Sequence, residues 1–121
     1  MSHERQPGMG FDLDRAMAMA RSDWQAGVDL GTLRDTIDAL DAEISVLLAR
    51  RQHWVTLAAY VKKDSGEDAV RAPERVDEVL DKVKALADEN GVSWGIVEPT
   101  YRALIAASIE HQLGVHRLLQ P

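Results

Sequence analysis

Residues 30–63, LGTLRDTIDALDAEISVLLARRQHWVTLAAYVKK, decide the fold of this sequence. The stretch contains no proline and a single glycine, Gly31, and Asp29 precedes it as a candidate N-terminal cap. Its apolar residues recur at alternating steps of three and four, the spacing of a helix packed lengthwise on other helices. They are Leu30, Leu33, Ile37, Leu40, Ile44, Leu47, Trp54, Ala58 and Val61. The pattern predicts one continuous helix of about 34 residues, roughly 50 Å long at 1.5 Å per residue.

Such a helix is too long for one chain of 121 residues to bury alone. A compact domain of this size is only about 30 Å across. A second copy of the chain must therefore cover the rest of the apolar seam. We expect an intertwined homodimer with two-fold symmetry.

A second helix is predicted after a loop. Residues 62–72, KKDSGEDAVRA, are expected to form that loop because they combine Ser-Gly with mixed charge. Pro73 suits the first position of a helix over residues 73–90, and Gly91 follows its end. The expected apolar face comprises Val76, Val79, Leu80, Val83, Leu86 and Ala87.

A third helix is predicted after Ser93, which is a candidate cap, and Pro99 is expected to bend its beginning. Its inward stripe comprises Val97, Tyr101, Leu104, Ile105, Ser108, Ile109 and Gln112. The fold class is therefore all-α, with three helices per chain and a very long first helix.

Residues 1–28 are expected to be an extension that precedes a helical domain over residues 29–118. We expect disorder over about the first ten residues. Residues 11–27, FDLDRAMAMARSDWQAG, predict a short additional helix. Its apolar face comprises Leu13, Met17, Ala20 and Trp24.

Composition excludes several function classes. The chain has no cysteine, so disulfides, thiolate metal sites and cysteine nucleophiles are excluded. A net charge of −6 argues against general binding to nucleic acid. The four histidines show no i,i+4 pairing, so no metal site is predicted. Without a leader peptide or an apolar run long enough to span a membrane, we expect a cytoplasmic protein.

Polar residues on faces that should be apolar point to a functional site. Arg51 occupies a position of the long seam, and Lys62 follows eleven residues later, about 20° round the helix. Ser108 and Gln112 stand one turn apart on the inward stripe of the third helix, and Arg75 lies in the first turn of the second. Together they predict a basic pocket within an acidic helical protein.

Each of these residues also has a structural interpretation. Arg51 can pair with a carboxylate of another helix or extend its charged end to water. Lys62 and Arg75 can be ordinary surface cations, and a buried Gln112 can serve the specificity of helix pairing. The coincidence of all of them on inward faces favours the pocket.

Arg34 lies 17 residues before Arg51, about 25 Å along the helix and about 100° round it. It is too far away to serve the same small pocket from the same chain. In an antiparallel dimer of the long helix, the partner's Arg34 can reach that pocket.

The segments LGTLRDTIDALDAEISVLLARR, Lys62, PERV and SIEHQ resemble the all-helical chorismate mutase family over about residues 29–113. The resemblance implies an intertwined helical dimer with two equal active sites. Each site takes a dicarboxylate such as chorismate and needs no cofactor and no metal. The reaction is a pericyclic rearrangement to prephenate, which requires neither a covalent intermediate nor a general base.

The resemblance also implies roles for individual residues. Arg34 would enter the site from the partner chain, and Arg51 would bind a substrate carboxylate. Lys62 and Gln112 would hydrogen-bond the ether oxygen of the breaking C–O bond. Ser108 would contact a substrate carboxylate or hydroxyl. Arg75 would lie near the ring, and Asp41 occupies a family position with a structural role.

The sequence departs from familiar mutases at Val76, where those enzymes carry a glutamate that helps to hold the ring hydroxyl. The segments RRQHWVTLAAYVK, APERV and ENG also resemble isochorismate-pyruvate lyases on the same scaffold. Ser108 instead suits a mutase. Rearrangement of 4-amino-4-deoxychorismate, and a non-catalytic or partner-activated dimer module, are further alternatives.

Overall fold

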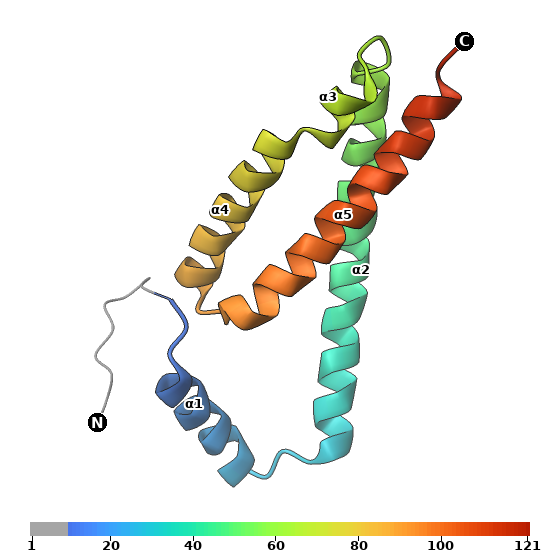
Figure 1. Ribbon diagram of the computed structural model, residues 1–121. Helices are drawn as coiled ribbons and strands as arrows, with labels where there is room; N and C mark the ends of the chain where they lie inside the picture. The colour runs from blue at the N-terminus through green and yellow to red at the C-terminus, as the bar shows by residue number, and fades with distance from the viewer. Residues whose placement is uncertain (1–9) are drawn as a thin grey trace.

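The computed structural model describes residues 10–121, and all regular structure in that range is helical. The helices are α1 (Leu13–Gln25), α2 (Leu30–Val61), α3 (Glu67–Arg71), α4 (Pro73–Asn90) and α5 (Trp94–Leu118). Helix α5 contacts α2, α3 and α4, and Figure 1 shows it beside the C-terminal half of α2. The N-terminal half of α2 extends beyond this group, with α1 near its far end (Figure 1). The all-α fold class is therefore confirmed.

The long helix predicted from the seam is confirmed as α2, which runs over Leu30–Val61. Its cap is also confirmed, because the Asp29 carboxylate accepts a hydrogen bond from the backbone N–H of Thr32 at 2.7 Å. Hydrogen bonding from the backbone and the side chain of Thr32 lowers the pKa of Asp29, since it stabilises the charged carboxylate. The additional N-terminal helix is present as α1, which Asp12 caps by accepting from the N–H of Arg15. The predicted disorder concerns mainly residues 1–9, which lie outside the described part of the chain.

The loop predicted over residues 62–72 is wrong in part, because it contains the short helix α3. Glu67 lies in the first turn of α3 and Arg71 in the last, which complements the helix dipole. Val70 anchors the helix in the core, where its side chain is only 3% exposed. A helix of five residues is too short to produce a recognisable periodicity, so tertiary packing rather than local sequence determines it.

Helix α4 begins at Pro73 and ends before Gly91, as predicted. Gly91 has a φ of +70°, the left-handed conformation that glycine adopts readily at a helix end. Ser93 occupies the N-cap of α5 without making a side-chain capping hydrogen bond, and α5 continues through Pro99. No helix in residues 10–121 is long and apolar enough to cross a membrane.

Within the described residues, the buried core lies where α2, α3, α4 and α5 meet. Its apolar members are Ala59, Val70, Leu80, Val83, Ala87, Ile105 and Leu113. Leu86 was predicted on the inward face of α4, but it is exposed in the single chain. It lies one turn from the buried Val83 and next to the buried Ala87, at the edge of the packed stripe rather than on it.

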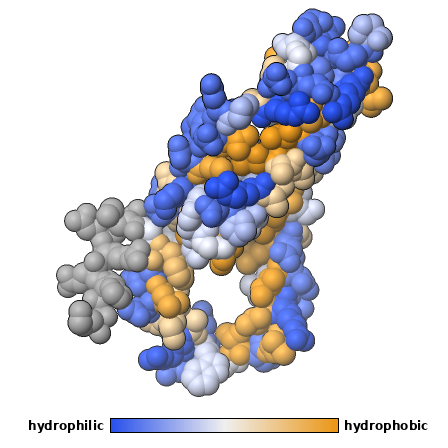
Figure 2. Space-filling view, viewed as in Figure 1, coloured by the Kyte–Doolittle hydropathy of each residue, from blue (hydrophilic) through white to orange (hydrophobic). Residues whose placement is uncertain are grey.

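The N-terminal half of α2 keeps its apolar seam uncovered in the single chain. The seam side chains are between 44% and 57% exposed, and Figure 2 shows apolar surface along this lower part of the molecule. They are Leu33, Ile37, Leu40, Ile44 and Leu47. A continuous apolar face of this length on a water-exposed helix is typical of an interaction surface. This exposure matches the reasoning that one chain cannot bury the whole of α2.

Candidate active site

A cavity of about 330 Å³ lies between the C-terminal half of α2, the α3–α4 segment and α5. Of the residues predicted to form a site, it is lined by Arg51, Lys62, Arg75, Val76, Ser108 and Gln112. Apolar side chains form the rest of its wall, including Trp54, Val79 and Ile105. The residues that the sequence singled out on three helices, apart from Arg34, are therefore brought together in one place.

The charged side chains that line this cavity are all positive. Among residues 10–121, four cationic residues line it, namely Arg51, Lys62, Arg71 and Arg75, and no aspartate or glutamate does. The chain as a whole has a net charge of −6. A cation-lined cavity in an acidic protein favours a small anion, because partly desolvated cations gain most from a ligand of opposite charge.

Arg51 points into this cavity from the seam of α2. Its Nη1 donates a hydrogen bond to the Ser108 hydroxyl of α5 at 2.9 Å. In residues 10–121 the ion pairs within 4.0 Å are made by other cations, so no carboxylate neutralises Arg51. The interpretation of Arg51 as half of a structural ion pair between helices is therefore wrong for the single chain. The guanidinium is oriented by a neutral hydroxyl and has no carboxylate partner among the described residues.

Lys62 and Gln112 form the second polar pair of the cavity. The Lys62 Nζ donates to the Gln112 Oε1 at 3.2 Å, and the Gln112 Nε2 donates to the carbonyl oxygen of Val55 at 3.1 Å. The contact with Val55 fixes the orientation of the amide, since Nε2 can donate to a carbonyl and Oε1 cannot. Gln112 is 8% exposed, so its amide is a fixed part of the wall.

Arg75 lines the cavity, but it is also part of a surface ion-pair cluster. Its Nη1 lies 2.6 Å from the Glu78 Oε1, and the Lys82 Nζ lies 2.9 Å from the same oxygen. The hydrogen bond from Lys82 and the two positive charges lower the pKa of Glu78. The pocket interpretation and the surface interpretation of Arg75 both describe part of its environment. Val76 lies next to it with an apolar side chain that faces the cavity.

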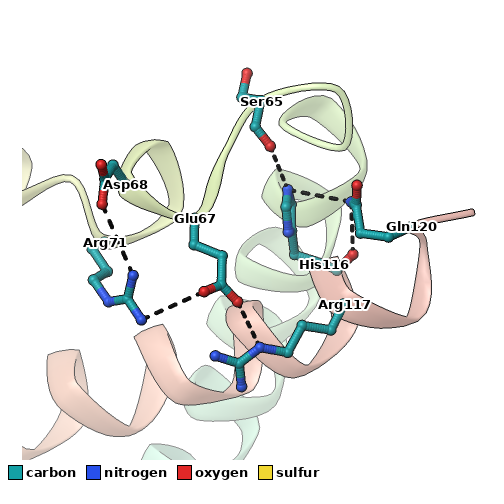
Figure 3. A network of polar contacts seen from close by, with 7 residues as sticks. All are labelled: Ser65, Glu67, Asp68, Arg71, His116, Arg117 and Gln120. Carbon is teal, nitrogen blue, oxygen red and sulfur yellow. Dashed lines mark hydrogen bonds and ion pairs between the residues drawn. The ribbon is translucent and has the colours of Figure 1, made fainter.

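Arg71 is a cavity residue that the sequence reasoning missed. It lies on α3, and Figure 3 shows its guanidinium between Glu67 and Asp68. The Arg71 Nη2 is 3.7 Å from the Glu67 Oε2, and its Nη1 is 4.0 Å from the Asp68 Oδ1. Glu67 also accepts a hydrogen bond from the Arg117 Nε of α5 at 2.6 Å. That bond lowers the pKa of Glu67, since it stabilises the carboxylate. Arg71 belonged to a segment predicted as loop, where no periodic signal indicated which side chains face inward.

Arg34 lies in the exposed N-terminal half of α2 and does not line the cavity. The helix rise places it about 25 Å from Arg51 along the same helix. The single chain therefore does not bring Arg34 to the site, and its contribution depends on a second chain.

The cavity matches the requirements of a small dianion with an apolar body. Its volume of about 330 Å³ is at the small end of ligand pockets. The cations can bind carboxylates, the Lys62–Gln112 pair can donate to a neutral oxygen, and the apolar wall can hold a ring.

Comparison with known proteins agrees with this geometry. The model of the family described as chorismate mutase type II matches residues 33–113. The isochorismate pyruvate lyase of Pseudomonas aeruginosa is 34% identical to the chain over 88 residues. That match covers 73% of this chain and 85% of the relative. No solved structure matches the chain at a significant level.

Proposed function

The chain belongs to the chorismate mutase type II family, and from this premise we propose that it is a chorismate mutase that rearranges chorismate to prephenate. The observation that carries the proposal is the cavity, which four cations and no carboxylate of the described part of the chain line. Chorismate carries two carboxylates and an enolpyruvyl ether on a small ring, which is the chemistry that this cavity is suited to bind. We further propose residues 29–118 as the catalytic domain and residues 1–28 as an extension of it.

The reaction is internal to the substrate. The ether C–O bond breaks while a C–C bond forms between the enolpyruvyl methylene and the ring, and six electrons move in one cycle. No proton is exchanged with the protein, so the site needs no general base and no nucleophile. Catalysis then rests on holding the folded conformer, which supplies proximity and orientation.

Each polar residue of the cavity has a place in this proposal. Arg51, oriented by Ser108, binds a substrate carboxylate. The Lys62 Nζ and the second Nε2 hydrogen of Gln112, the one not bound to Val55, donate to the ether oxygen, which gains negative charge as its C–O bond breaks. A preorganised donor at such an oxygen typically contributes a factor of about 10²–10³ in rate. Arg71 and Arg75 supply further positive charge at the edge of the cavity.

We also propose that the functional unit is a homodimer in which the partner's Arg34 completes each site. The exposed seam of α2 supports this, because a second copy that buries it would run alongside the same helix. The substrate's second carboxylate would then bind Arg34 across the interface. A charged contact at an interface is well suited to fix the register of two long helices.

Elimination of pyruvate from isochorismate is a second candidate, because Val76 lines the cavity where a mutase would place a glutamate. In that reaction the ether C–O bond breaks while a ring hydrogen moves to the enolpyruvyl methylene, giving salicylate and pyruvate. The relative from Pseudomonas aeruginosa carries the name of this activity. The same cations would bind the same carboxylates, so the two reactions differ in how the ring is held. A third substrate, 4-amino-4-deoxychorismate, is disfavoured, because no aspartate or glutamate that the structure describes lines the cavity of the single chain to pair with its amine.

The test is a substrate panel with the purified protein. Chorismate, isochorismate and 4-amino-4-deoxychorismate are incubated separately, and the products are separated by chromatography. Prephenate formed from chorismate, faster than in a matched Arg51→Ala sample, is the expected result. Salicylate and pyruvate formed only from isochorismate would replace the mutase with the lyase. A lack of turnover on all three would favour a non-catalytic or partner-activated dimer module.

A further inference from the structure

The C-terminal turns of α5 hold the end of α2 through a buried histidine. His116 is only 3% exposed, and its Nε2 lies 2.8 Å from the carbonyl oxygen of Ser65 and 3.1 Å from that of Lys62. Figure 3 shows the ring facing the turn that contains Ser65. Lys62 is the C-cap of α2, and its carbonyl group belongs to the set that a helix end leaves without an intrahelical partner.

The partners of His116 show that its Nε2 carries a hydrogen. Both are carbonyl oxygens, which only accept, so Nε2 carries a hydrogen and donates to them. The Gln120 Nε2 lies 3.5 Å from the same nitrogen, but both nitrogens are donors, so this contact is not a hydrogen bond. Gln120 instead donates to the carbonyl oxygen of Lys63 at 2.9 Å. His116 on α5 and Gln120, two residues beyond the end of that helix, therefore bind three carbonyl groups in the turn that follows α2.

Lys62 is thus held by α5 at both of its ends. Gln112 accepts a hydrogen bond from its ammonium group, and His116, one turn further on, donates to its backbone carbonyl. Fixing the backbone of a residue limits the region that its flexible side chain can reach. A rigid helix that contacts both ends sets where Nζ lies relative to the cavity.

We propose that His116 is a positioning residue that places the Lys62 ammonium group for reaction. It does not line the cavity, so it acts through Lys62 rather than on the substrate. The inference rests on the proposed function, in which Lys62 donates to the ether oxygen. Misplacement of a catalytic group by about 1 Å can cost 10²-fold in rate, so the position of Lys62 is worth controlling.

The environment of Nδ1, the other ring nitrogen of His116, suggests substitutions that test this role. Nδ1 is buried and has no hydrogen-bond partner among the described residues. A side chain that retains only the Nε2 donor therefore loses no contact at Nδ1. Glutamine places an amide N–H at about the distance of Nε2, whereas phenylalanine fills similar space without a donor. Leu113→Ala is the structural control, because Leu113 is 1% exposed on the same helix and does not line the cavity.

The experiment compares His116→Gln, His116→Phe and Leu113→Ala at a temperature where circular dichroism shows each to be folded. We expect His116→Phe to lower kcat about 10–100-fold with less than about a threefold change in KM, since only the transition state depends on Lys62. His116→Gln should recover most of kcat. Leu113→Ala should keep kcat per folded molecule. If the phenylalanine variant does not fold, His116→Leu takes its place.

A double-mutant cycle with Lys62→Ala separates positioning from general damage. If His116 acts through Lys62, adding His116→Phe to Lys62→Ala should change kcat by less than about threefold. Effects of the two substitutions that multiply, or an unchanged kcat in His116→Phe, would overturn the inference.

Hydrogen–deuterium exchange tests the same contact without turnover. His116→Phe should accelerate exchange over residues 62–66, and Leu113→Ala and His116→Gln should not do so selectively. If the wild-type protein turns over none of the three substrates, the proposed function fails. The exchange result then still decides whether His116 holds the end of α2, and an unchanged pattern would overturn the inference on its own.

Discussion

Replacement of Arg51 by methionine should separate the stability of the protein from its activity. Arg51 is half-buried, it donates to Ser108 at 2.9 Å, and no carboxylate of residues 10–121 lies within ion-pair distance of it. Methionine keeps the aliphatic stem that packs on the seam and removes the charge.

We expect this substitution to leave the stability of the fold unchanged or higher and to lower the catalytic activity. A partly desolvated cation without an anion costs stability, so the free energy of unfolding should stay within about 0.5 kcal/mol or rise by up to about 1 kcal/mol. The loss of a charged hydrogen bond to a substrate carboxylate should cost about 2.7–4 kcal/mol in the transition state, which is 10²–10³ in kcat/KM. The variant should therefore keep about the stability of the wild type, or exceed it, and be nearly inactive.

The assay combines urea unfolding, followed by circular dichroism, with kcat/KM from chromatographic product analysis. Arg50→Met is the matched control, because Arg50 is exposed, does not line the cavity and lies about 100° away on the same helix. It should retain kcat/KM within about threefold, as expected for a surface residue outside the site. The reasoning would be refuted if Arg51→Met lost several kcal/mol of stability while its kcat/KM per folded molecule stayed at the wild-type value.

Three other changes test neighbouring parts of the molecule. Ser108→Ala should lower kcat/KM about tenfold in the same assay, the equivalent of about 1.5 kcal/mol for one hydrogen bond to a charged group, without lowering Tm appreciably. Because the bond from Arg117 lowers the pKa of Glu67, the carboxylate stabilises the fold above its ordinary pKa of 4.5, and this stabilisation is lost as the pH falls through the lowered value. Thermal melts from pH 7 to pH 3 should therefore show Glu67→Gln less stable than the wild type at neutral pH, with a difference that disappears in acid. Arg34→Ala and Arg51→Ala chains refolded together should recover about one quarter of wild-type kcat, since about half the dimers are mixed and each mixed dimer has one intact site. No recovery would mean that Arg34 does not act across the interface.

Local sequence determined the main helices of this protein. The start of α2 at Asp29, the start of α4 at Pro73 and its end at Gly91 follow from residue types whose effect is felt within one turn. The seam of α2 follows from a periodicity that needs no knowledge of the rest of the chain. For the same reason Arg51 could be recognised as a cation on an apolar face. The family resemblance then supplied an expected role for it.

Only the tertiary structure decided which groups meet. Arg71 reaches the cavity because Val70 anchors α3 in the core, and nothing within five residues of chain predicts that packing. His116 looked like an isolated histidine, since its partners Lys62 and Ser65 lie 54 and 51 residues away in the sequence. Their contact depends on how α5 crosses the end of α2. Helix formation is governed by short-range forces and can be predicted from the sequence. Which residues line the cavity depends instead on contacts between segments that are far apart in the chain.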